Sequence, residues 1–159
     1  MIIEYNDKYE EKVKDLLVLL QEYISSIDKD GYNIVTKEFR EEYFKKTIEE
    51  VEKYHGKIFL YEENKNVLGM IVGVINNEAI STYDYKVPKT GRITELIVTK
   101  NARRIGVGTK LMDYMEKYFK EVGCIDVLLG VFAYNEGARK FYEKNGYKAR
   151  MTDMRKIGI

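Results

Sequence analysis

The sequence predicts a single α/β domain in which a mixed, mostly antiparallel central sheet of six to seven strands carries helices on both faces. The length of 159 residues suits one domain with a sizeable core and is too short for two ordinary ones. Apolar residues recur at strand spacing in some segments and at helical spacing in others. No repeat, low-complexity tract or linker rich in Pro or Gly divides the chain, so we expect residues 1–159 to form one layered domain.

The first third of the chain predicts a short strand and two helices. The segment "MIIEY" has the pattern of a strand, and residues 8–27 carry apolar side chains at helical spacing. The polar segment "SIDKDGYN" interrupts this helix, and Thr36 begins a second helix that "YHGK" ends. The apolar positions are Val13, Leu16, Leu17, Leu20, Tyr23, Ile24 and Ile27 in the first helix, and Phe39, Tyr43, Ile48 and Val51 in the second.

Three strands are predicted next. The runs "KIFLYEE" and "NVLGMIVGVIN" form an antiparallel pair with a tight turn at Asn64–Asn66. The second run is apolar on both faces, so it is expected to be central in the sheet. A polar connection with several tyrosines, "STYDYKVPKTG", then leads to the third strand, "RITELIVT".

The last third predicts a helix, a strand, a short helix and a final strand. The first of these helices has an apolar face, and the following run "IDVLLGVF" is too apolar on both faces to be an edge strand. The segment "NEGARKFYEKNGY" predicts a short helix ended by Gly146, the residue type that a left-handed helix stop prefers. The segment "YKARMTDMRKI" can supply the last strand. The apolar face of the longer helix consists of Val107, Leu111, Met115, Tyr118 and Val122.

Composition excludes several classes of function. A formal net charge of +1 gives no general reason to expect a nucleic acid or an acidic membrane surface as a partner. A single cysteine, Cys124, and a single histidine, His55, provide neither an internal disulfide nor a metal-binding cluster, and are expected to be a core thiol and a surface imidazole. The start of the chain is charged too early for a signal peptide, and no apolar run approaches ~18 residues. We therefore expect a cytoplasmic protein.

One segment, "ARRIGVGTKL", points to an anion-binding turn. The first N–H groups of a helix have no carbonyl partners, and the helix dipole adds partial positive charge there. Gly106 and Gly108 remove Cβ atoms where a phosphate oxygen would approach, and Arg103 and Arg104 add full charges. The alternative is that a turn with glycines is only a turn, and the neighbouring segments must decide between the two.

Two common phosphate-binding motifs do not fit this turn. A nucleotide-triphosphate P-loop has Gly followed by Lys and then Ser or Thr, whereas Gly108 is followed by Thr109 and Lys110. A dinucleotide-binding fold has a third glycine where this chain has Leu111, and its turn follows the first strand of the fold.

With its neighbours included, the segment resembles the GNAT superfamily of acyl-CoA-dependent N-acyltransferases. Arg103 to Gly108 match the family's Gln/Arg-x-x-Gly-x-Gly/Ala turn after the strand "ELIVT". The segment "NEGARKFYEKNGY" matches the family's Asn-x-x-Ala-x-x-Phe-Tyr-x-x-x-Gly-Phe/Tyr motif at Asn135, Ala138, Phe141, Tyr142, Gly146 and Tyr147. Both motifs occur in the usual order and separation, over residues 91–147, and the resemblance implies the GNAT fold for the whole chain.

The resemblance implies acetyl-CoA as co-substrate, without a metal, in a V-shaped opening between the strands "RITELIVT" and "IDVLLGVF". An arm rich in amide groups can hydrogen-bond along such a strand as an added strand would. By this resemblance, backbone groups of Ile97 and Val98 contact the pantetheine and acyl end, and Asn135, Ala138 and Tyr142 contact the cofactor from the next helix. The pyrophosphate is held by the turn residues Arg103, Arg104, Ile105, Gly106, Val107, Gly108 and Thr109.

The implied reaction is direct attack of an amine on a thioester. A backbone N–H near Val98 is the candidate donor to the oxygen that gains negative charge. Tyr142 is the candidate acid for the leaving thiolate, because a thiol has a pKa near ~8.5, and the alternative is a core aromatic side chain. Glu95 is the candidate base, since a lysine-type amine has a pKa near ~10.4 and must lose a proton before attack. Strand alternation places Glu95 with Ile97 on one face, and the alternative is a carboxylate at the sheet surface.

The acceptor amine is left open by the sequence. The segments 25–33 and 81–89 are where the resemblance places acceptor walls, and Tyr83, Asp84 and Tyr85 could suit a cationic amine, although solvated loops are an equal alternative. The few residues after Tyr147 are hardly enough for the strand pair common in relatives, so the site is open or is completed by a second subunit in a homodimer. The alternative to an N-acetyltransferase of small-molecule or peptide amines is an acyl-CoA-binding sensor or interaction module without turnover.

Overall fold

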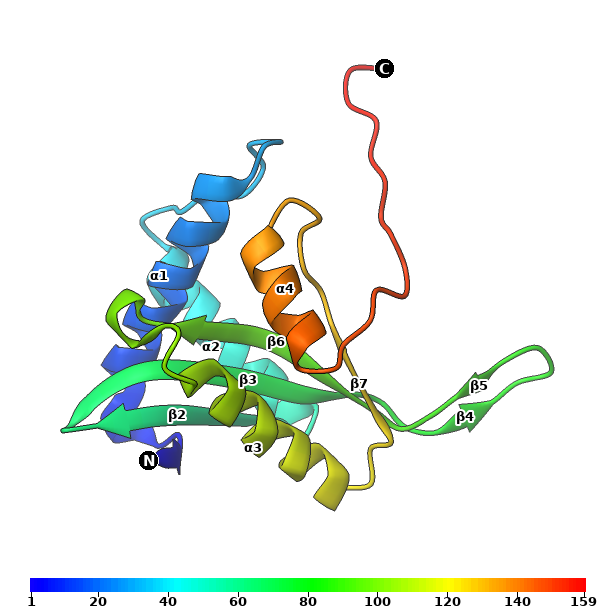
Figure 1. Ribbon diagram of the computed structural model, residues 1–159, viewed down its shortest axis with the longest axis horizontal. Coiled ribbons are helices and arrows are strands. Elements are labelled where there is room, and N and C mark those ends of the chain that lie inside the picture. The colour runs from blue at the N-terminus through cyan, green and yellow to red at the C-terminus, as the bar shows by residue number, and fades with distance from the viewer.

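The computed structural model describes all residues, 1–159, and its core is one five-stranded mixed sheet in the order β1-β2-β3-β6-β7. All neighbouring strands are antiparallel except β6 and β7, which are parallel. A separate two-stranded hairpin, β4–β5, projects from the body of the molecule (Figure 1). The strands are β1 Ile2–Glu4, β2 Lys57–Glu63, β3 Asn66–Asn77, β4 Ile80–Ser81, β5 Lys86–Val87, β6 Thr90–Val98 and β7 Asp126–Leu129.

Helices cover both faces of the sheet, as the sequence predicts. The helices are α1 Glu10–Ile27, α2 Phe39–Lys53, α3 Val107–Glu121 and α4 Glu136–Lys144, with short 3-10 helices at Asp7–Tyr9 and Lys100–Ala102. Helices α1 and α2 lie on one face, and α3 and α4 on the other (Figure 1). Gly146 follows α4 in the left-handed conformation, φ +88°, which confirms the predicted helix stop.

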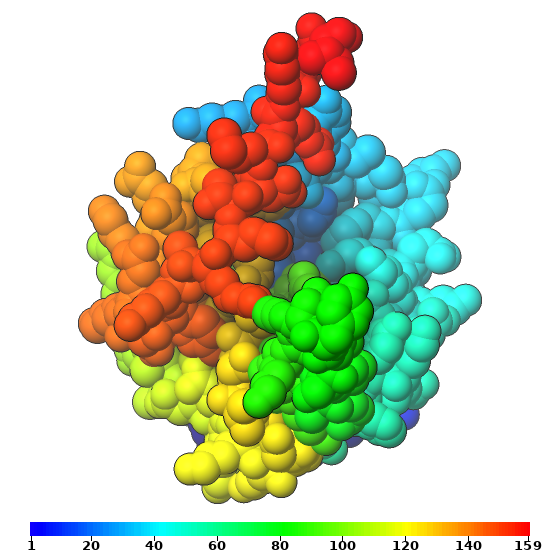
Figure 2. Space-filling view, turned by 90° about the vertical axis from the view of Figure 1, so that its right-hand side faces the viewer, coloured from blue at the N-terminus to red at the C-terminus, as the bar shows by residue number.

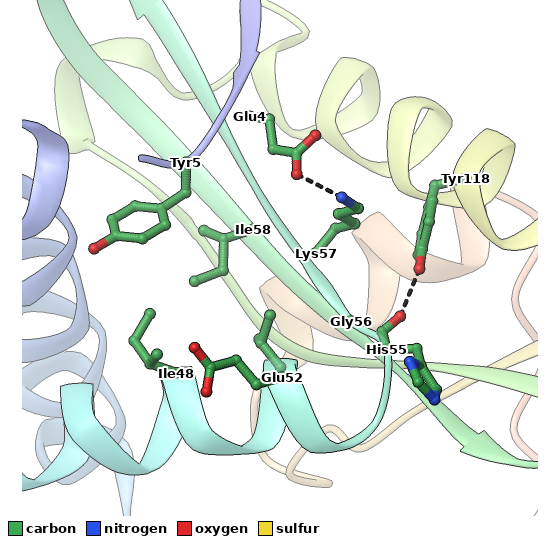
Figure 3. Close-up of a pocket in the computed structure, with 10 residues that line it drawn as sticks. Glu4, Tyr5, Ile48, Glu52, His55, Gly56, Lys57, Ile58 and Tyr118 are labelled. Carbon is green, nitrogen blue, oxygen red and sulfur yellow. Dashed lines mark hydrogen bonds and ion pairs between the residues drawn. The ribbon is translucent and has the colours of Figure 1, made fainter. Parts of the chain in front are cut away.

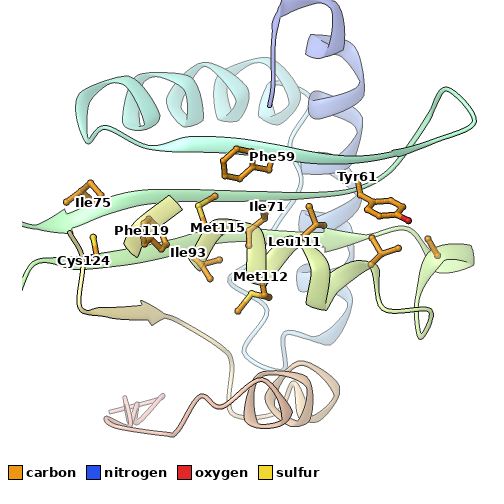
Figure 4. Close-up of a cluster of buried hydrophobic side chains, with 12 residues drawn as sticks. Phe59, Tyr61, Ile71, Ile75, Ile93, Leu111, Met112, Met115, Phe119 and Cys124 are labelled. Atoms are coloured by element: carbon orange, nitrogen blue, oxygen red, sulfur yellow. The ribbon is translucent and has the colours of Figure 1, made fainter. Parts of the chain in front are cut away.

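Each face of the sheet has its own hydrophobic cluster. On the α3 face, Leu111, Met112, Met115 and Phe119 pack against side chains of β2, β3 and β6 (Figure 4). On the α1 face, the helix buries Val13, Leu16 and Leu17 against the opposite sides of the same strands. Because β3 contributes to both clusters, its continuous apolar run is explained and its predicted central position is confirmed.

Two details of the predicted sheet are wrong. Residues 147–157 form no strand, and the chain after α4 makes no regular secondary structure. Strand β7 is an edge strand rather than an inner one, and it is shorter than the apolar run that predicts it. Both errors have one physical cause, since a segment adopts a strand only over the length for which a neighbour pairs with it. Here β6 is the sole partner of β7, and residues 147–157 pair with no strand.

The single cysteine and the single histidine lie where the sequence predicts. Cys124 is buried and unpaired, and His55 lies at the surface. None of the helices is long and apolar enough to cross a membrane.

Candidate functional site

The sheet opens between β6 and β7. These strands pair only from Thr90–Asp126 to Ile93–Leu129, and the second half of β6, Glu95–Val98, has no strand on that side. Figure 1 shows β7 and its following loop diverging from β6 toward α4. The unpaired edge therefore presents backbone N–H and C=O groups in the V-shaped opening that the sequence motifs predict.

A β-bulge in β6 decides which side chains face which helices. Val72 of β3 pairs with Glu95, whereas Gly73 pairs with Ile93, so Thr94 is an extra residue in β6. Ile93 packs in the α3-side cluster, and Ile97 is buried in the α1-side cluster. The bulge thus turns Glu95 toward α1 and α2, on the same face as Ile97 as predicted. The Ile97 side chain is buried, and its backbone groups face β3, as does the Thr99 N–H that donates to the Leu68 oxygen. The backbone groups of Val98 therefore face the opening, and those of Ile97 do not, which corrects the prediction for Ile97.

The edge of β6 leads to the turn that begins α3. Arg104 and Gly106 both have left-handed backbone conformations, φ +65° and +87°, and Gly106 is the N-cap of the helix. No side chain caps this end, and no acidic residue lies in its first turn. The first N–H groups of α3 are therefore open to an anion, and Arg103, Arg104, Ile105, Gly106 and Thr109 are all exposed around them.

The two glycines of the turn serve different purposes. A Cβ on Gly106 would meet no atom within 4 Å, so its backbone conformation is what requires glycine. A Cβ on Gly108 would lie 3.1 Å from the ring of Phe141, so this glycine lets α3 approach α4 closely. The side chain of Val107 is buried in the core, which leaves its backbone N–H as the group that faces the turn.

Arg103 connects this turn to two other elements. Its Nε donates to the backbone oxygen of Val98, the last residue of β6, at 3.0 Å. Its guanidinium group lies over the ring of Tyr23 from α1, 5.7 Å from the centroid. Arg103 therefore lies between the anion-binding turn and the open strand edge, in contact with both.

Asn135 begins α4 on the other side of the opening. Its Oδ1 accepts a hydrogen bond from the backbone N–H of Ala138 at 3.3 Å, as an N-cap does, and another from the Tyr23 hydroxyl at 3.2 Å. Tyr23 thus contacts both sides of the opening, although the sequence indicates only that it belongs to an amphipathic helix. A second contact joins the same regions, where the Tyr134 hydroxyl donates to Asp28 at 2.9 Å.

Tyr142 lies on the inner side of α4. Its ring packs edge-on against Phe141 and Tyr147, with centroids 5.4 and 6.0 Å away. Burial, assisted by the charge of Glu95, raises the pKa of Tyr142 to about 12. The hydroxyl therefore keeps its proton at neutral pH, which a proton donor requires.

Glu95 is a carboxyl group of the site whose pKa is raised. Its pKa is raised to about 7, chiefly by burial; the hydrogen bond from Tyr43 lowers the pKa, the negative charge of Glu50 raises it, and the charge of Lys46 lowers it. The Tyr43 hydroxyl donates to Oε1 of Glu95 at 2.5 Å. A carboxyl group with a pKa near neutrality is suited to taking up a proton at physiological pH.

The sequence does not single out Tyr43. It lies on the apolar side of α2, where a tyrosine usually belongs to the core, and its ring stacks on Phe39 at 4.7 Å. Burial, and then the charge of Glu95, raise its pKa well above the ordinary value, so its hydroxyl remains a donor. Only the bulge in β6, which is a feature of strand pairing, brings Glu95 to Tyr43.

The two segments predicted to form acceptor walls, 25–33 and 81–89, lie in different parts of the structure. In the segment 25–33, Asp28 accepts hydrogen bonds from the backbone of Asp30, Tyr32 and Asn33, which orders the connection after α1. In the segment 81–89, Tyr83 is fully exposed in the projecting β4–β5 hairpin. The structure thus brings the first segment to the opening and leaves the tip of the second in solvent (Figure 1).

A further cavity of 440 Å³ lies away from these residues, between the end of α2 and the start of β2. Figure 3 shows two polar contacts in its lining, Lys57 bound to Glu4 and the Tyr118 hydroxyl bound to the backbone oxygen of His55. It contains none of the predicted site residues. The predicted site residues lie instead around the opening between β6 and β7.

Two curated proteins resemble parts of the chain. One is the uncharacterized N-acetyltransferase MJ1530 of Methanocaldococcus jannaschii, 38% identical over 61 residues, which are 38% of this chain and 39% of that protein. The other is the N-alpha-acetyltransferase of Sulfurisphaera tokodaii, 30% identical over 107 residues, which are 64% of this chain and 62% of that protein. The chain thus matches less than two thirds of the length of either relative.

Solved structures match the whole fold. A protein of Pyrococcus furiosus described as an acetyl transferase is 29% identical, with a TM-score of 0.69 over 98% of this chain and 97% of that chain. The enzyme AAC(6')-Iy, solved with the bisubstrate analog CoA-S-monomethyl-acetylneamine, is 14% identical, with a TM-score of 0.70 over 98% of this chain and 97% of that chain, and shows the fold. The model of the acetyltransferase (GNAT) family matches residues 22–147, which include both sequence motifs and the opening. The chain therefore belongs to the acetyltransferase (GNAT) family.

Proposed function

We propose that the protein is an N-acetyltransferase that transfers the acetyl group of acetyl-CoA to a primary amine by direct attack. The observation that carries the proposal is the continuity of the unpaired β6 edge with the uncapped N-terminus of α3, with Glu95 and Tyr142 beside that edge. An amide-rich arm suits the strand edge and a pyrophosphate suits the helix end. The groups along the strand edge and at the helix end thus suit acetyl-CoA as the co-substrate.

The residues that would hold acetyl-CoA follow from this fit. Backbone groups of Val98 would bind the pantetheine and acyl end, because those of Ile97 face β3. Asn135, Ala138 and Tyr142 would contact the arm from α4. For this, Arg103 must release the Val98 oxygen that it now contacts, and its guanidinium group then becomes available to the pyrophosphate. The remaining pyrophosphate ligands would be Arg104, Ile105, Gly106, Val107, Gly108 and Thr109.

The chemical roles are divided among three groups. Bound acetyl-CoA supplies the thioester on which the amine acts. Glu95 takes a proton from the incoming ammonium group, directly or through water, because its pKa near 7 leaves a large ionised fraction at neutral pH. The Val98 N–H stabilises the carbonyl oxygen as it gains negative charge, and Tyr142 gives its proton to the departing sulfur.

The names of two similar proteins and the negative charge of Glu95 indicate which acceptor amines to test. The Sulfurisphaera relative is named an N-alpha-acetyltransferase, so peptide N-termini are the first class of acceptor to test. Small amines are the second, because the AAC(6')-Iy structure contains an acetylated amine in its bisubstrate analog. Both classes are cationic before attack and suit the carboxylate of Glu95. We do not expect nucleic acids or membranes as partners, and a cytoplasmic location is a prediction that cell fractionation tests.

An acceptor screen tests the proposal. Purified protein is incubated with acetyl-CoA and a panel of peptides and small amines, and thiol release and a mass increase of the acceptor are measured together. Acetylation of any acceptor, lost in Glu95→Gln and strongly slowed in Tyr142→Phe, supports the enzyme. Tight acetyl-CoA binding with no thiol release for every acceptor would instead identify a binding module without turnover.

A further inference from the structure

Arg92 lies on the same face of β6 as the proposed base Glu95. In the pairing of β6 with β3, Glu95 is opposite Val72, which is buried in the α1-side cluster. Arg92 is opposite Val74, which shares the face of Val72 because side chains alternate along β3. Residues that are paired across two strands point to the same face of the sheet, so both charged side chains point to the side of α1 and α2.

The two residues beside Arg92 point to the opposite face. A Cβ on Gly91 would lie 2.5 Å from the Phe119 ring of α3, and Ile93 packs in the α3-side cluster. The bulge in β6 inserts one extra residue, so Arg92 and Glu95 share a face although they are three positions apart. The rise of a strand places their Cα atoms about 7–9 Å from each other.

The helices leave this part of the sheet uncovered. The buried residues of the α1-side cluster come from α1, β2 and β3, with only Ile97 from β6 and none from β7. Arg92 is exposed although β6 has a neighbouring strand on each side at this position. In Figure 2 the surface is hollowed between the cyan α2 and the red C-terminal segment, residues 148–159, beside the green β4–β5 hairpin that leads into β6. A ligand can therefore reach this face of β6 from solvent.

The guanidinium group of Arg92 has no carboxylate partner. Arg40 is the one arginine of the chain that forms ion pairs. On the neighbouring strand β7, the carboxylate of Asp126 lies two residues before the partner of Arg92 and accepts a hydrogen bond from the Thr90 hydroxyl at 2.6 Å. The donors of Arg92 are therefore available to an anion from solution.

The positive charge of Arg92 is not balanced by the other charges beside the proposed base. The charges of Lys46 and Glu50 on α2 both act on Glu95, and they act in opposite directions. These two side chains also lie 3.8 Å apart as an ion pair, so their charges offset each other. The face around Glu95 thus combines one carboxylate for an amine with one guanidinium group for an anion.

We propose that Arg92 binds a carboxylate of the acceptor while Glu95 receives its amine, and that the preferred acceptors are peptides with Asp or Glu after the N-terminal residue. The inference rests on the proposed function, because it names the acceptor of that reaction. A guanidinium group binds a carboxylate through two parallel hydrogen bonds. In such a peptide the α-amine and the side-chain carboxylate can lie about 6–8 Å apart, which is close to the spacing of Arg92 and Glu95. Polyamines lack the carboxylate, and Arg92 repels their additional positive charges.

A matched pair of peptides tests this preference. Two peptides that begin Ser-Glu and Ser-Lys and are otherwise identical are acetylated by the unchanged protein, by Arg92→Glu and by the control Lys117→Glu. The control makes the same change in charge type at an exposed position of α3. We expect the unchanged protein and the control to favour the Ser-Glu peptide by about 10-fold in kcat/KM, chiefly through KM, and Arg92→Glu to favour the Ser-Lys peptide. Equal values for the two peptides, or a preference that survives in Arg92→Glu, would overturn the inference.

Peptide binding distinguishes a failure of this inference from a failure of the proposed function. Calorimetric titration of both peptides into protein saturated with CoA measures recognition without turnover. Selective binding of the Ser-Glu peptide that is lost in Arg92→Glu, with acetylation of neither peptide, would contradict acetyl transfer and support carboxylate binding by Arg92. Acetylation of both peptides without selective binding would overturn the inference and leave the proposed function in place.

Small ω-amino acids carry the same two groups as these peptides. The pair 6-aminohexanoate and hexylamine differs only by the carboxylate and is tested in the same assay. A lower kcat/KM for 6-aminohexanoate than for the Ser-Glu peptide supports peptides as the acceptors. A higher value for 6-aminohexanoate would overturn the assignment to peptides.

Discussion

The Tyr43 hydroxyl donates to Oε1 of Glu95 at 2.5 Å, and this contact joins α2 to the strand that borders the proposed acetyl-CoA site. The hydrogen bond from Tyr43 occupies Oε1 of Glu95, which leaves Oε2 for an acceptor amine. Burial raises the pKa of Glu95 to about 7, and the hydrogen bond from Tyr43 limits that rise. The charged and titratable groups near Glu95 are Tyr43, Lys46 and Glu50 from α2 and Tyr142 from α4.

Tyr43→Phe is expected to shift the pH dependence of acetyl transfer. Without the donated hydrogen bond, the pKa of Glu95 rises above 7, and a base with a higher pKa is protonated over a wider range. The acid limb of the kcat/KM profile should therefore move to higher pH, by roughly 1 unit for one hydrogen bond. The control Tyr114→Phe removes an exposed hydroxyl of α3. A profile of Tyr43→Phe that coincides with the control would show that this contact does not set the ionisation of the base.

Glu95→Gln is expected to remove activity and to stabilise the protein at alkaline pH. The raised pKa means that the folded state binds a proton that the unfolded state has released between pH 4.5 and about 7. Stability from this group is thus present below pH 4.5 and is lost as pH rises through 7. The free energy of unfolding of Glu95→Gln at pH 8 should exceed that of the unchanged protein by about 1–3 kcal/mol.

Denaturant unfolding at pH 5 and pH 8 measures this difference. The stabilisation should shrink at pH 5, where Glu95 in the folded protein is itself neutral. An equal increase in the free energy of unfolding at both pH values would mean that burial does not disfavour the ionised form of Glu95.

Tyr142→Phe is expected to lower kcat by about 100-fold, the order found for a positioned general acid. The affinity for acetyl-CoA should change little, because the ring and its packing against Phe141 and Tyr147 remain. Steady-state kinetics together with calorimetric titration of acetyl-CoA separate the two quantities. An unchanged kcat would show that Tyr142 is a core aromatic residue and not the general acid.

Gly106→Ala is expected to weaken acetyl-CoA binding by at least about 10-fold. The residue has φ +87°, a conformation that costs an L-residue about 1–2 kcal/mol, so the turn must distort. A bulky residue such as Val should abolish binding. The matched control is Gly137→Ala in α4, where a Cβ also meets nothing within 4 Å and φ is not positive. Equal affinities of Gly106→Ala and Gly137→Ala would contradict the phosphate-binding role of the turn.

Local chemistry along the chain predicts most of the fold and indicates where the proposed acetyl-CoA site lies. Strand β2 has the predicted ends, and α3 begins immediately after the glycine that was expected to lie at its start. These features depend on residue periodicity and on the backbone preferences of Gly106 and Gly146, which are properties of short segments. The motifs around Arg103 and Asn135 indicated the family for the same reason.

The tertiary structure alone decided the face of Glu95, its contact with Tyr43 and the edge position of β7. The bulge at Thr94 depends on how β6 pairs with β3, and the length of β7 depends on which neighbours are present. A strand is stabilised by hydrogen bonds to another part of the chain, so a segment such as 147–157 can be predicted as a strand and still lack a partner. The spacing of apolar residues is a property of one segment, whereas strand pairing depends on two segments that meet only in the folded protein.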